Sequence, residues 1–356
     1  MKERRDKFRK VLIDNDIDAI LIKSKSNKRY IGALPGSGVK VLITKDDDYQ
    51  IMDGRYINEA SEVTSGFTNI VHEQGKNYIK VVKEILGSRN RIGVEPNQIL
   101  LKEYLNLKDF DLEINLLNDE LEWIRRCKDI YEIKSIKKAC EITDKVFKEI
   151  LDNIRIGMKE YELSALIQYL SISNGASGMA FDTIVASGKR GSMPHGRPTD
   201  KEFAAHEFIT IDFGIIYEGY QSDMTRTICI DEPDPKLKKI YDIVLEAQMA
   251  GVNYIKAGVA CKDVDKHVRD IISGYGFGEY FTHGLGHGIG IGDGELPILN
   301  SKSNTILEEG MVMSCEPGIY IPNTCGVRIE DDVLIENGVG VVLNNTSKDL
   351  IILEGK

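Results

Sequence analysis

Five side chains of the types that bind divalent metals lie between residues 212 and 330 of this sequence. Four are carboxylates and one is an imidazole, and in chain order they are Asp212, Asp223, His287, Glu316 and Glu330. An oxygen-rich set without a thiolate suits a pair of divalent cations better than a single structural zinc ion. The set therefore predicts a metallohydrolase.

Each of these side chains lies in a short, distinctive motif. The motifs are Ile211-Asp212-Phe213-Gly214, Ser222-Asp223-Met224-Thr225-Arg226-Thr227, His283-Gly284-Leu285-Gly286-His287-Gly288, Glu316-Pro317-Gly318 and Arg328-Ile329-Glu330-Asp331-Asp332. An isolated Asp or Glu on a strand is usually a solvated residue. Five in such contexts, on two hairpins and a glycine-rich segment, favour a shared metal site instead.

The first hairpin is expected from residues 208–215 and 222–230, which read as strands joined by a turn that contains Glu218-Gly219. Side chains alternate between the two faces of a strand. If the hairpin is centred between Tyr217 and Glu218, Asp212 pairs directly with Asp223. Two facing carboxylates are unfavourable unless a cation lies between them.

The second hairpin is expected from residues 311–316 and 327–335, which flank a loop through Pro322-Asn323. Arg328 and Glu330 share a face of the later strand. Glu316 can meet Glu330 across the pair, so the same argument for a cation applies here.

Glycines recur around His287 from Gly284 to Gly294, without the spacing of a dinucleotide-binding fingerprint or the lysine of a phosphate-binding loop. His283 and His287 are spaced like the histidines of a zinc-protease HExxH helix. Gly284, however, replaces the glutamate that this motif requires, and the glycines would destabilise the helix. We therefore expect a glycine-rich strand or loop that brings backbone and imidazole close to a ligand.

The length of 356 residues predicts two domains, which we place at residues 1–121 and 122–356. In the first, helical patterns at 5–13, 77–86 and 100–107 alternate with strand patterns at 19–22, 39–44, 49–52 and 91–95. This alternation predicts a small α/β domain. The string Asp53-Gly54-Arg55-Tyr56 is interpreted as a turn after a strand, with a functional role as the alternative.

The second domain shows an internal repeat at an offset of 101 residues, after a long helix expected at 129–154. The matched pairs are Gly157 and Gly258, Leu163 and Val264, Ile167 and Val268, Leu170 and Ile271, and Gly175 and Gly276. Each copy reads as a long helix, a glycine break, a second amphipathic helix and strands. The repeat predicts an α+β domain with pseudo-twofold symmetry and a ligand-binding cleft between its halves.

Composition excludes several other classes of protein. A hydrophobic content of 42% and a charged content of 29% are typical of a globular chain. The net charge of −10 argues against a nucleic-acid partner, and no apolar run is long enough to cross a membrane. The amino terminus is charged and lacks the apolar stretch of a signal peptide. The six cysteines show no CxxC spacing, which is typical of reduced thiols in a cytoplasmic protein.

The order Asp, Asp, His, Glu, Glu in these motifs resembles the pita-bread metallopeptidases, which include aminopeptidase P, prolidase and methionine aminopeptidase. The resemblance covers the second domain strongly. It extends more weakly to the first, whose size and Asp-Gly-Arg-Tyr string are similar to the aminopeptidase P branch. It implies that Asp212, Asp223 and Glu330 bind or bridge two cations, with His287 and Glu316 completing the site. Mn²⁺ is the first expectation, and Co²⁺, Fe²⁺ and Zn²⁺ also accept these ligands.

The same resemblance implies roles in catalysis and substrate binding. The two cations would lie about 3.5–4 Å apart and activate a bridging water, whose proton Glu316 would accept. His195 and His283 match histidines of the substrate pocket, although His195 also reads as a loop residue beside two prolines. Arg328 matches an arginine that orients the acidic ligands, with a surface salt bridge as the alternative. A homodimer is implied by the family alone.

Two positions depart from the family pattern. A histidine that contacts the substrate carbonyl normally follows the metal-binding histidine by seven positions, and Gly294 occupies this position here. The loss of one such donor typically lowers turnover by about 100- to 1,000-fold. The dipeptidase branch also places an arginine for the substrate carboxylate shortly afterwards, where this sequence has Ile298.

From these residues we expect a dinuclear aminopeptidase that removes the residue preceding proline from Xaa-Pro-Yaa peptides. An Xaa-Pro dipeptidase, or prolidase, is the first alternative because its metal site would be the same. The second is a metal-binding relative with weak or no peptidase activity, which Gly294 favours. A creatinase-like hydrolase without metals is disfavoured because such an enzyme does not need the complete ligand set.

Overall fold

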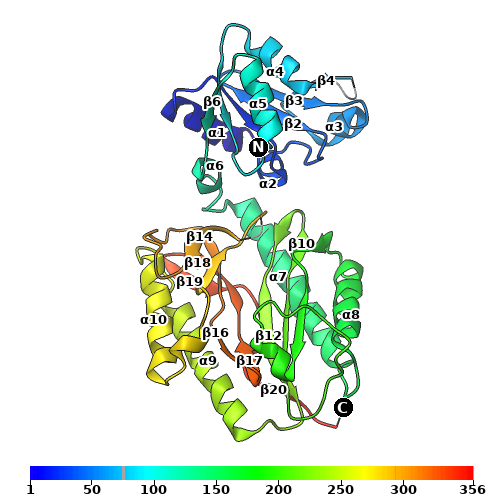
Figure 1. Cartoon of the computed structure of the whole chain (residues 1–356), viewed down its shortest axis with the longest axis vertical. Helices are drawn as coiled ribbons and strands as arrows, with labels where there is room; N and C mark the ends of the chain where they lie inside the picture. The colour runs from blue at the N-terminus through cyan, green and yellow to red at the C-terminus, as the bar shows by residue number, and fades with distance from the viewer. Residues whose placement is uncertain (74–76, 293, 356) are drawn as a thin grey trace. The chain divides into compact units, whose positions relative to one another are not determined.

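The chain forms two compact units, Met1–Arg125 and Arg126–Lys356. The computed structural model describes residues 1–73, 77–292 and 294–355 (Figure 1). The domain boundary expected near residue 121 lies within the short helix α6 (Glu120–Trp123). Within the described residues, no helix is both long and apolar enough to span a membrane. All six cysteines are free thiols.

The first unit is a six-stranded mixed sheet with helices around it. In spatial order its strands are β4 (Thr68–Val71), β3 (Asp48–Met52), β2 (Lys40–Thr44), β1 (Ala19–Ile22), β5 (Arg91–Val94) and β6 (Glu113–Leu116). Its helices are α1 (Lys2–Asp14), α2 (Lys25–Tyr30), α3 (Ile57–Val63), α4 (Tyr78–Leu86), α5 (Leu101–Asp109) and α6. The central strand β1 is fully buried. The small α/β domain predicted from the sequence is thereby confirmed.

The strands that the sequence pattern did not predict lie at the two edges of this sheet. The side chains of β4 and β6 are all half-buried or exposed. They therefore show neither an apolar run nor a clear alternation. The turn predicted at Asp53 is present, because the backbone N–H of Tyr56 donates to the Asp53 carbonyl at 3.2 Å and Arg55 pairs with the Asp53 carboxylate.

The second unit consists of two similar halves, with helices on the outside and strands between them (Figure 1). The first half contains α7 (Ile130–Leu151), α8 (Glu160–Ser173), β7 (Gly178–Met179), β8 (Ile184–Ser187), η1 (Gly188–Ser192), β9 (Phe208–Phe213), β10 (Ile215–Tyr217), β11 (Tyr220–Gln221) and β12 (Met224–Ile230). The second contains α9 (Pro235–Tyr254), α10 (Cys261–Gly274), η2 (Gly278–Tyr280), β13 (Gly286–Gly288), β14 (Glu295–Leu299), β15 (Val312–Cys315), β16 (Gly318–Ile321), β17 (Cys325–Arg328), β18 (Asp331–Glu336) and β19 (Val339–Val342). The last strand, β20 (Ile351–Leu353), joins the sheet of the first half in the order β20-β12-β9-β8.

The internal repeat predicted from the sequence is confirmed by the helices. The bounds of α10 are those of α8 shifted by 101 residues. The glycine before each helix has a positive φ, 82° at Gly157 and 87° at Gly258. Such a left-handed conformation favours glycine because it has no Cβ. The larger sheet of each half, β20-β12-β9-β8 and β14-β13-β15-β18-β19, has a matching pair of outer helices, which gives the pseudo-twofold α+β domain that the repeat predicts.

Candidate active site

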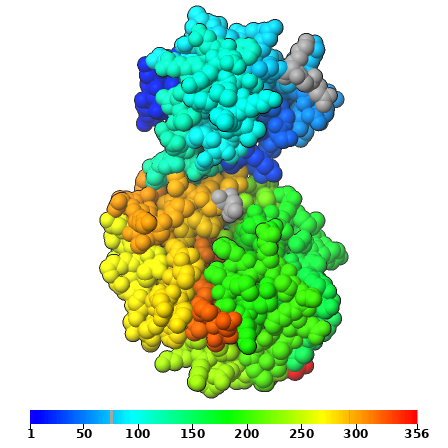
Figure 2. Space-filling model, in the orientation of Figure 1, coloured from blue at the N-terminus to red at the C-terminus, as the bar shows by residue number. Residues whose placement is uncertain are grey.

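One cavity, of about 580 Å³, gathers the candidate residues of the second unit. Figure 2 shows the two halves of the second unit side by side, the first half in green and the second half in yellow and orange. The cavity is lined by all five candidate metal ligands and by the three further residues assigned to catalysis or substrate, namely Asp212, Asp223, His287, Glu316 and Glu330 with His195, His283 and Arg328. The structure thus brings together every site residue that the sequence suggested.

In the first hairpin, the pairing between the two strands is shifted by two residues from the predicted pairing. Asp212 on β9 lies opposite Thr225 on β12, so the expected direct pairing with Asp223 is wrong. The reason is the turn, where Glu218 and Gly219 both have positive φ, 47° and 89°, and form a two-residue hairpin loop. Because side chains alternate with a period of two, this shift keeps both aspartates on one face.

The two strands are also interrupted beside Asp223. Gly214 follows the end of β9, and a Cβ built on it would lie 1.9 Å from the Ser222 carbonyl oxygen. The Ser222 hydroxyl accepts a hydrogen bond from the backbone of Ile215 at 3.2 Å. The next N–H, that of Asp223, donates to the Asp332 carboxylate at 2.9 Å and not to a strand carbonyl. This contact fixes the Asp223 backbone where the strand breaks.

The second hairpin has the predicted register. β15 pairs with β18 through Cys315 and Asp331, and β16 pairs with β17 through Gly318 and Arg328. Glu316 lies in the gap between β15 and β16. Because the register is the same before and after this gap, Glu316 lies opposite Glu330, as expected. The backbone N–H of Glu330 donates to the Thr225 carbonyl at 3.1 Å. This bond ties the two halves together at the site.

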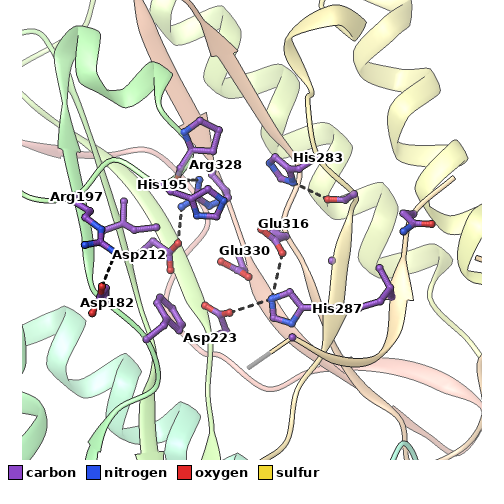
Figure 3. A pocket seen from close by; sticks show the side chains of 18 residues that line it. Asp182, His195, Arg197, Asp212, Asp223, His283, His287, Glu316, Arg328 and Glu330 are labelled. Atoms are coloured by element: carbon purple, nitrogen blue, oxygen red, sulfur yellow. Dashed lines mark hydrogen bonds and ion pairs between the residues drawn. The ribbon is translucent and has the colours of Figure 1, made fainter. Parts of the chain in front are cut away.

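His287 lies on β13, which is the glycine-rich strand expected there. A Cβ on Gly286 would lie 2.2 Å from the Ser314 carbonyl oxygen, so only glycine allows the strands to approach this closely. The imidazole Nε2 lies 3.7 Å from Oδ2 of Asp223 and 3.7 Å from Oε1 of Glu316 (Figure 3). The histidine therefore faces carboxylates from both halves of the domain.

Three of the carboxylates are buried together. Asp212, Asp223 and Glu330 can each offer one oxygen such that all three oxygens lie within 4.8 Å of one another. Burial, followed by the neighbouring carboxylates, raises the pKa of Asp223 and Glu330 well above its usual range. Among the described residues, Oδ1 of Asp212 and Oδ1 of Asp223 have no hydrogen-bond partner. Divalent cations would satisfy these oxygens and offset the repulsion, so the donor set fits a metal centre.

Arg328 orients two of these ligands, Asp212 directly and Glu330 through Thr225. Its side chain is only 3% exposed, so it does not form a surface salt bridge. Its guanidinium donates to Oδ2 of Asp212 at 2.6 Å and to the Thr225 hydroxyl at 3.0 Å. The same hydroxyl donates to Oε2 of Glu330 at 2.6 Å. Thr225 thus joins two ligands through one hydrogen-bond chain.

His283 is held as a neutral imidazole. Its Nδ1 lies 2.7 Å from the Gly284 carbonyl, which only accepts, so Nδ1 carries the proton. Nε2 then accepts from the Tyr320 hydroxyl at 2.9 Å, and that hydroxyl accepts from Arg328 at 2.9 Å. Burial lowers the pKa of His283 from 6.5 to about 4. His195, by contrast, is exposed toward the cavity.

The two positions that depart from the family pattern, Gly294 and Ile298, also line the cavity. Gly294 has a φ of +60°, and a Cβ built on it meets no heavy atom of the described, non-adjacent residues within 4 Å. The adjacent Glu295 is buried, accepts from the backbone of Gly292 at 2.8 Å and pairs with Lys128 at 3.4 Å. The cavity is therefore open at the point where the resemblance leads one to expect an imidazole.

Sequence reasoning missed several residues of the site. The additional lining residues include Phe181, Asp182, Ile184, Pro194, Arg197 and Asn300. Thr225 lies within the Ser-Asp-Met-Thr-Arg-Thr motif and Arg197 lies two residues after His195, so proximity to a candidate residue was an available signal. Tyr320 contacts His283 across 37 residues, and no local pattern indicates this contact.

This chain has a duplicated α+β unit whose cleft gathers four carboxylates and a histidine, which places it in the class of metallohydrolases. The chain belongs to metallopeptidase family M24, whose family model matches residues 134–337. The model of the creatinase/prolidase N-terminal domain matches residues 4–127. The pita-bread fold expected from the motifs is thus confirmed, together with the domain that precedes it.

Relatives of similar length carry related names. An Xaa-Pro dipeptidase from Pyrococcus horikoshii is 40% identical, over 99% of this chain and 99% of its own. The solved structure of an Xaa-Pro dipeptidase from Bacillus anthracis is 39% identical, with a TM-score of 0.95 and 99% coverage of both chains. That of an X-Pro aminopeptidase from Thermotoga maritima is 35% identical, with a TM-score of 0.88 over 95% of this chain and 98% of the other.

Proposed function

We propose that this chain is a metal-dependent peptidase that cleaves Xaa-Pro dipeptides. The observation that carries the proposal is the complete set of metal-ligand side chains around one cavity, in a chain that is 40% identical over nearly its full length to an Xaa-Pro dipeptidase. The sequence alone led us to favour an aminopeptidase. The names of the relatives favour the dipeptidase, and the two reactions need the same metal centre.

In this proposal, two divalent cations are held by Asp212, Asp223, His287, Glu316 and Glu330, with Mn²⁺ as the first choice. When bound, such cations polarise a scissile carbonyl and lower the pKa of water. Burial raises the pKa of Glu316, and its carboxylate accepts a hydrogen bond from the Ser314 hydroxyl at 3.2 Å. A buried carboxylate with a raised pKa takes up a proton more readily than an ordinary glutamate, which suits it to the role of proton acceptor.

The remaining residues position the ligands and the substrate. Arg328 orients Asp212 through its 2.6 Å hydrogen bond. Tyr320 fixes the orientation of His283, so that a neutral imidazole borders the cavity. The exposed side chain of His195 is available to the substrate itself. These groups bind and orient, while the open position at Gly294 leaves one side of the substrate without an imidazole donor.

An Xaa-Pro aminopeptidase is the second candidate, because Ile298 cannot bind the carboxylate of a dipeptide. A weakly active or silent metal-binding relative is the third, and Gly294 is the observation in its favour. The homodimer and the cytoplasmic location remain predictions. Light scattering during size-exclusion chromatography tests the first, and fractionation of the source cells tests the second.

The test offers Ala-Pro, Ala-Pro-Ala and Ala-Ala to protein loaded with Mn²⁺, with Asp223→Asn as the matched inactive control. We expect the wild type to cleave Ala-Pro fastest and the variant to cleave none. Faster cleavage of Ala-Pro-Ala would establish the aminopeptidase instead. If fully metallated wild type cleaves none of the three peptides, the proposed function is wrong and the silent relative is supported.

A further inference from the structure

Arg197 lines the same cavity as the metal-ligand side chains. Its side chain is 82% exposed and forms an ion pair of 3.1 Å with Asp182, which is 79% exposed and lines the cavity too. Figure 3 shows both residues on the side of Asp212, away from His283 and His287. A pair this exposed contributes little to stability and exchanges readily for another partner.

The backbone beneath this side chain is held firmly. Arg190 donates to the Arg197 carbonyl at 2.6 Å and pairs with the fully buried Glu160 at 3.0 Å. Glu160 also accepts from the backbone and the hydroxyl of Thr199, at 3.0 and 2.7 Å. At the other end, Arg328 donates to the Pro194 carbonyl at 3.2 Å. A fixed backbone therefore presents the exposed guanidinium, which lowers the backbone entropy lost when it binds a ligand.

The charges around the cavity suggest what the Arg197 guanidinium binds. A dipeptide keeps a free carboxylate on the residue next to the scissile bond, so this group must enter a cavity lined by carboxylates. Among the described lining residues, the permanent cations are Arg197 and Arg328. All three nitrogens of Arg328 already donate to protein groups, whereas within the described part of the chain the side chain of Arg197 pairs with one exposed acid, Asp182.

We propose that Arg197 is the carboxylate anchor of this cleft and thereby a specificity-determining residue. Its guanidinium leaves Asp182 and binds the carboxylate at the carboxyl end of an Xaa-Pro dipeptide, for which its planar fork is suited. This inference rests on the proposed function, since it concerns the substrate of the same site. It assigns the anchoring of the substrate carboxylate to the first half of the domain and not to the position of Ile298.

The test compares Ala-Pro with its carboxamide, Ala-Pro-NH₂, on metal-loaded wild type and on Arg197→Ala. Loss of a charge-assisted hydrogen bond lowers kcat/KM for Ala-Pro about 10- to 100-fold, chiefly through KM. Cleavage of Ala-Pro-NH₂ stays at the wild-type value. Arg197→Lys retains part of the preference for the free carboxylate, because it keeps the charge but not the fork. Asp182→Asn leaves the KM for Ala-Pro equal or lower.

Arg155→Ala removes another exposed arginine of the same unit, outside the cavity, and leaves both substrates unaffected. If Arg197→Ala lowers both substrates equally, or neither, the anchor is overturned while the proposed function stands. If wild type cleaves neither substrate, the proposed function fails. Calorimetric binding of an Ala-Pro analogue whose peptide carbonyl is reduced to CH₂, as the free acid and as the amide, then tests the role of Arg197 without cleavage. Arg197→Ala must weaken binding of the free acid and not of the amide. If wild type and Arg197→Ala bind the free acid equally well, Arg197 is not the carboxylate anchor.

Discussion

Two walls of the same cavity are built in opposite ways. The ligand wall carries the carboxylates and is defined by Asp212, Asp223, Glu316 and Glu330. The glycine wall lines the same cavity and is defined by Gly284, Gly286, Gly294 and Ile298. Buried hydrogen bonds fix the ligand wall, in which Thr225 joins Glu330 to Arg328 and Arg328 binds Asp212. The glycine wall offers no comparable side chain at Gly294, where a Cβ meets open space.

This difference separates two properties that a metallopeptidase usually combines. Metal binding depends on the ligand wall together with His287 on β13, and hydrogen bonds from Arg328 and Thr225 constrain Asp212 and Glu330. Substrate handling depends on groups at the rim and on the glycine wall, where one expected donor is missing. Changes to the ligand wall are therefore expected to alter metal content first, and changes to the glycine wall to alter turnover with the metals in place.

The largest effect is expected from Asp223→Asn on the ligand wall. Removal of a ligand weakens metal binding by more than about 100-fold, since loss of even an outer hydrogen-bond partner costs about 10- to 100-fold. Metal content after dialysis measures this, with Asp270→Asn, an exposed acid on α10, as the control. In chelator the variant melts no lower than wild type, because a buried carboxylate is removed. Full metal retention by Asp223→Asn would contradict the assignment.

The stability of the folded cavity should depend on pH through His283, because burial lowers the pKa of His283 from 6.5 to about 4. The unfolded chain therefore binds a proton between these values while the folded chain does not. Stability from this group is complete above pH 6.5 and is lost as the pH falls through 4, by about 3 kcal/mol at most. Urea unfolding in chelator at pH 7 and at pH 4.5 measures the loss. We expect a smaller loss in His283→Gln, and equal losses would refute the prediction.

Thr225→Val tests the support behind the ligand wall. The change removes the hydroxyl that donates to Glu330 and accepts from Arg328, so metal affinity falls about 10- to 100-fold. Thr227→Val is the matched control, because its hydroxyl lies on the same strand but donates to the Arg328 carbonyl. Calorimetric titration with Mn²⁺ compares the two. Equal affinities in both variants would mean that Thr225 serves the fold alone.

The smallest effect is expected from Gly294→His on the glycine wall. The space is open, but a side chain at φ +60° costs about 1 kcal/mol, so the melting temperature falls slightly. An imidazole there raises kcat for Ala-Pro by about 10-fold, which is less than the full value of a well-placed donor. Gly294→Ala carries the same strain without the imidazole. If both variants have the same kcat, the absent histidine does not limit turnover.

The sequence was informative where chemistry or pattern is local. The five ligands stood in their own motifs, and the 101-residue repeat anticipated matching helices with a glycine break before the second helix of each half. The register of the first hairpin could not be predicted in this way, because it depends on the backbone of Glu218. The contact between Tyr320 and His283, and the position of Arg197 on the cavity wall, arise from packing between distant segments.

The most direct test of the central claim is the metal content per chain, measured together with Ala-Pro cleavage during titration of metal-free protein with Mn²⁺. We expect binding that saturates at about two equivalents, with cleavage that rises alongside it and disappears in Asp223→Asn. Wild-type protein that binds no Mn²⁺, or that cleaves Ala-Pro equally well in chelator, would contradict it.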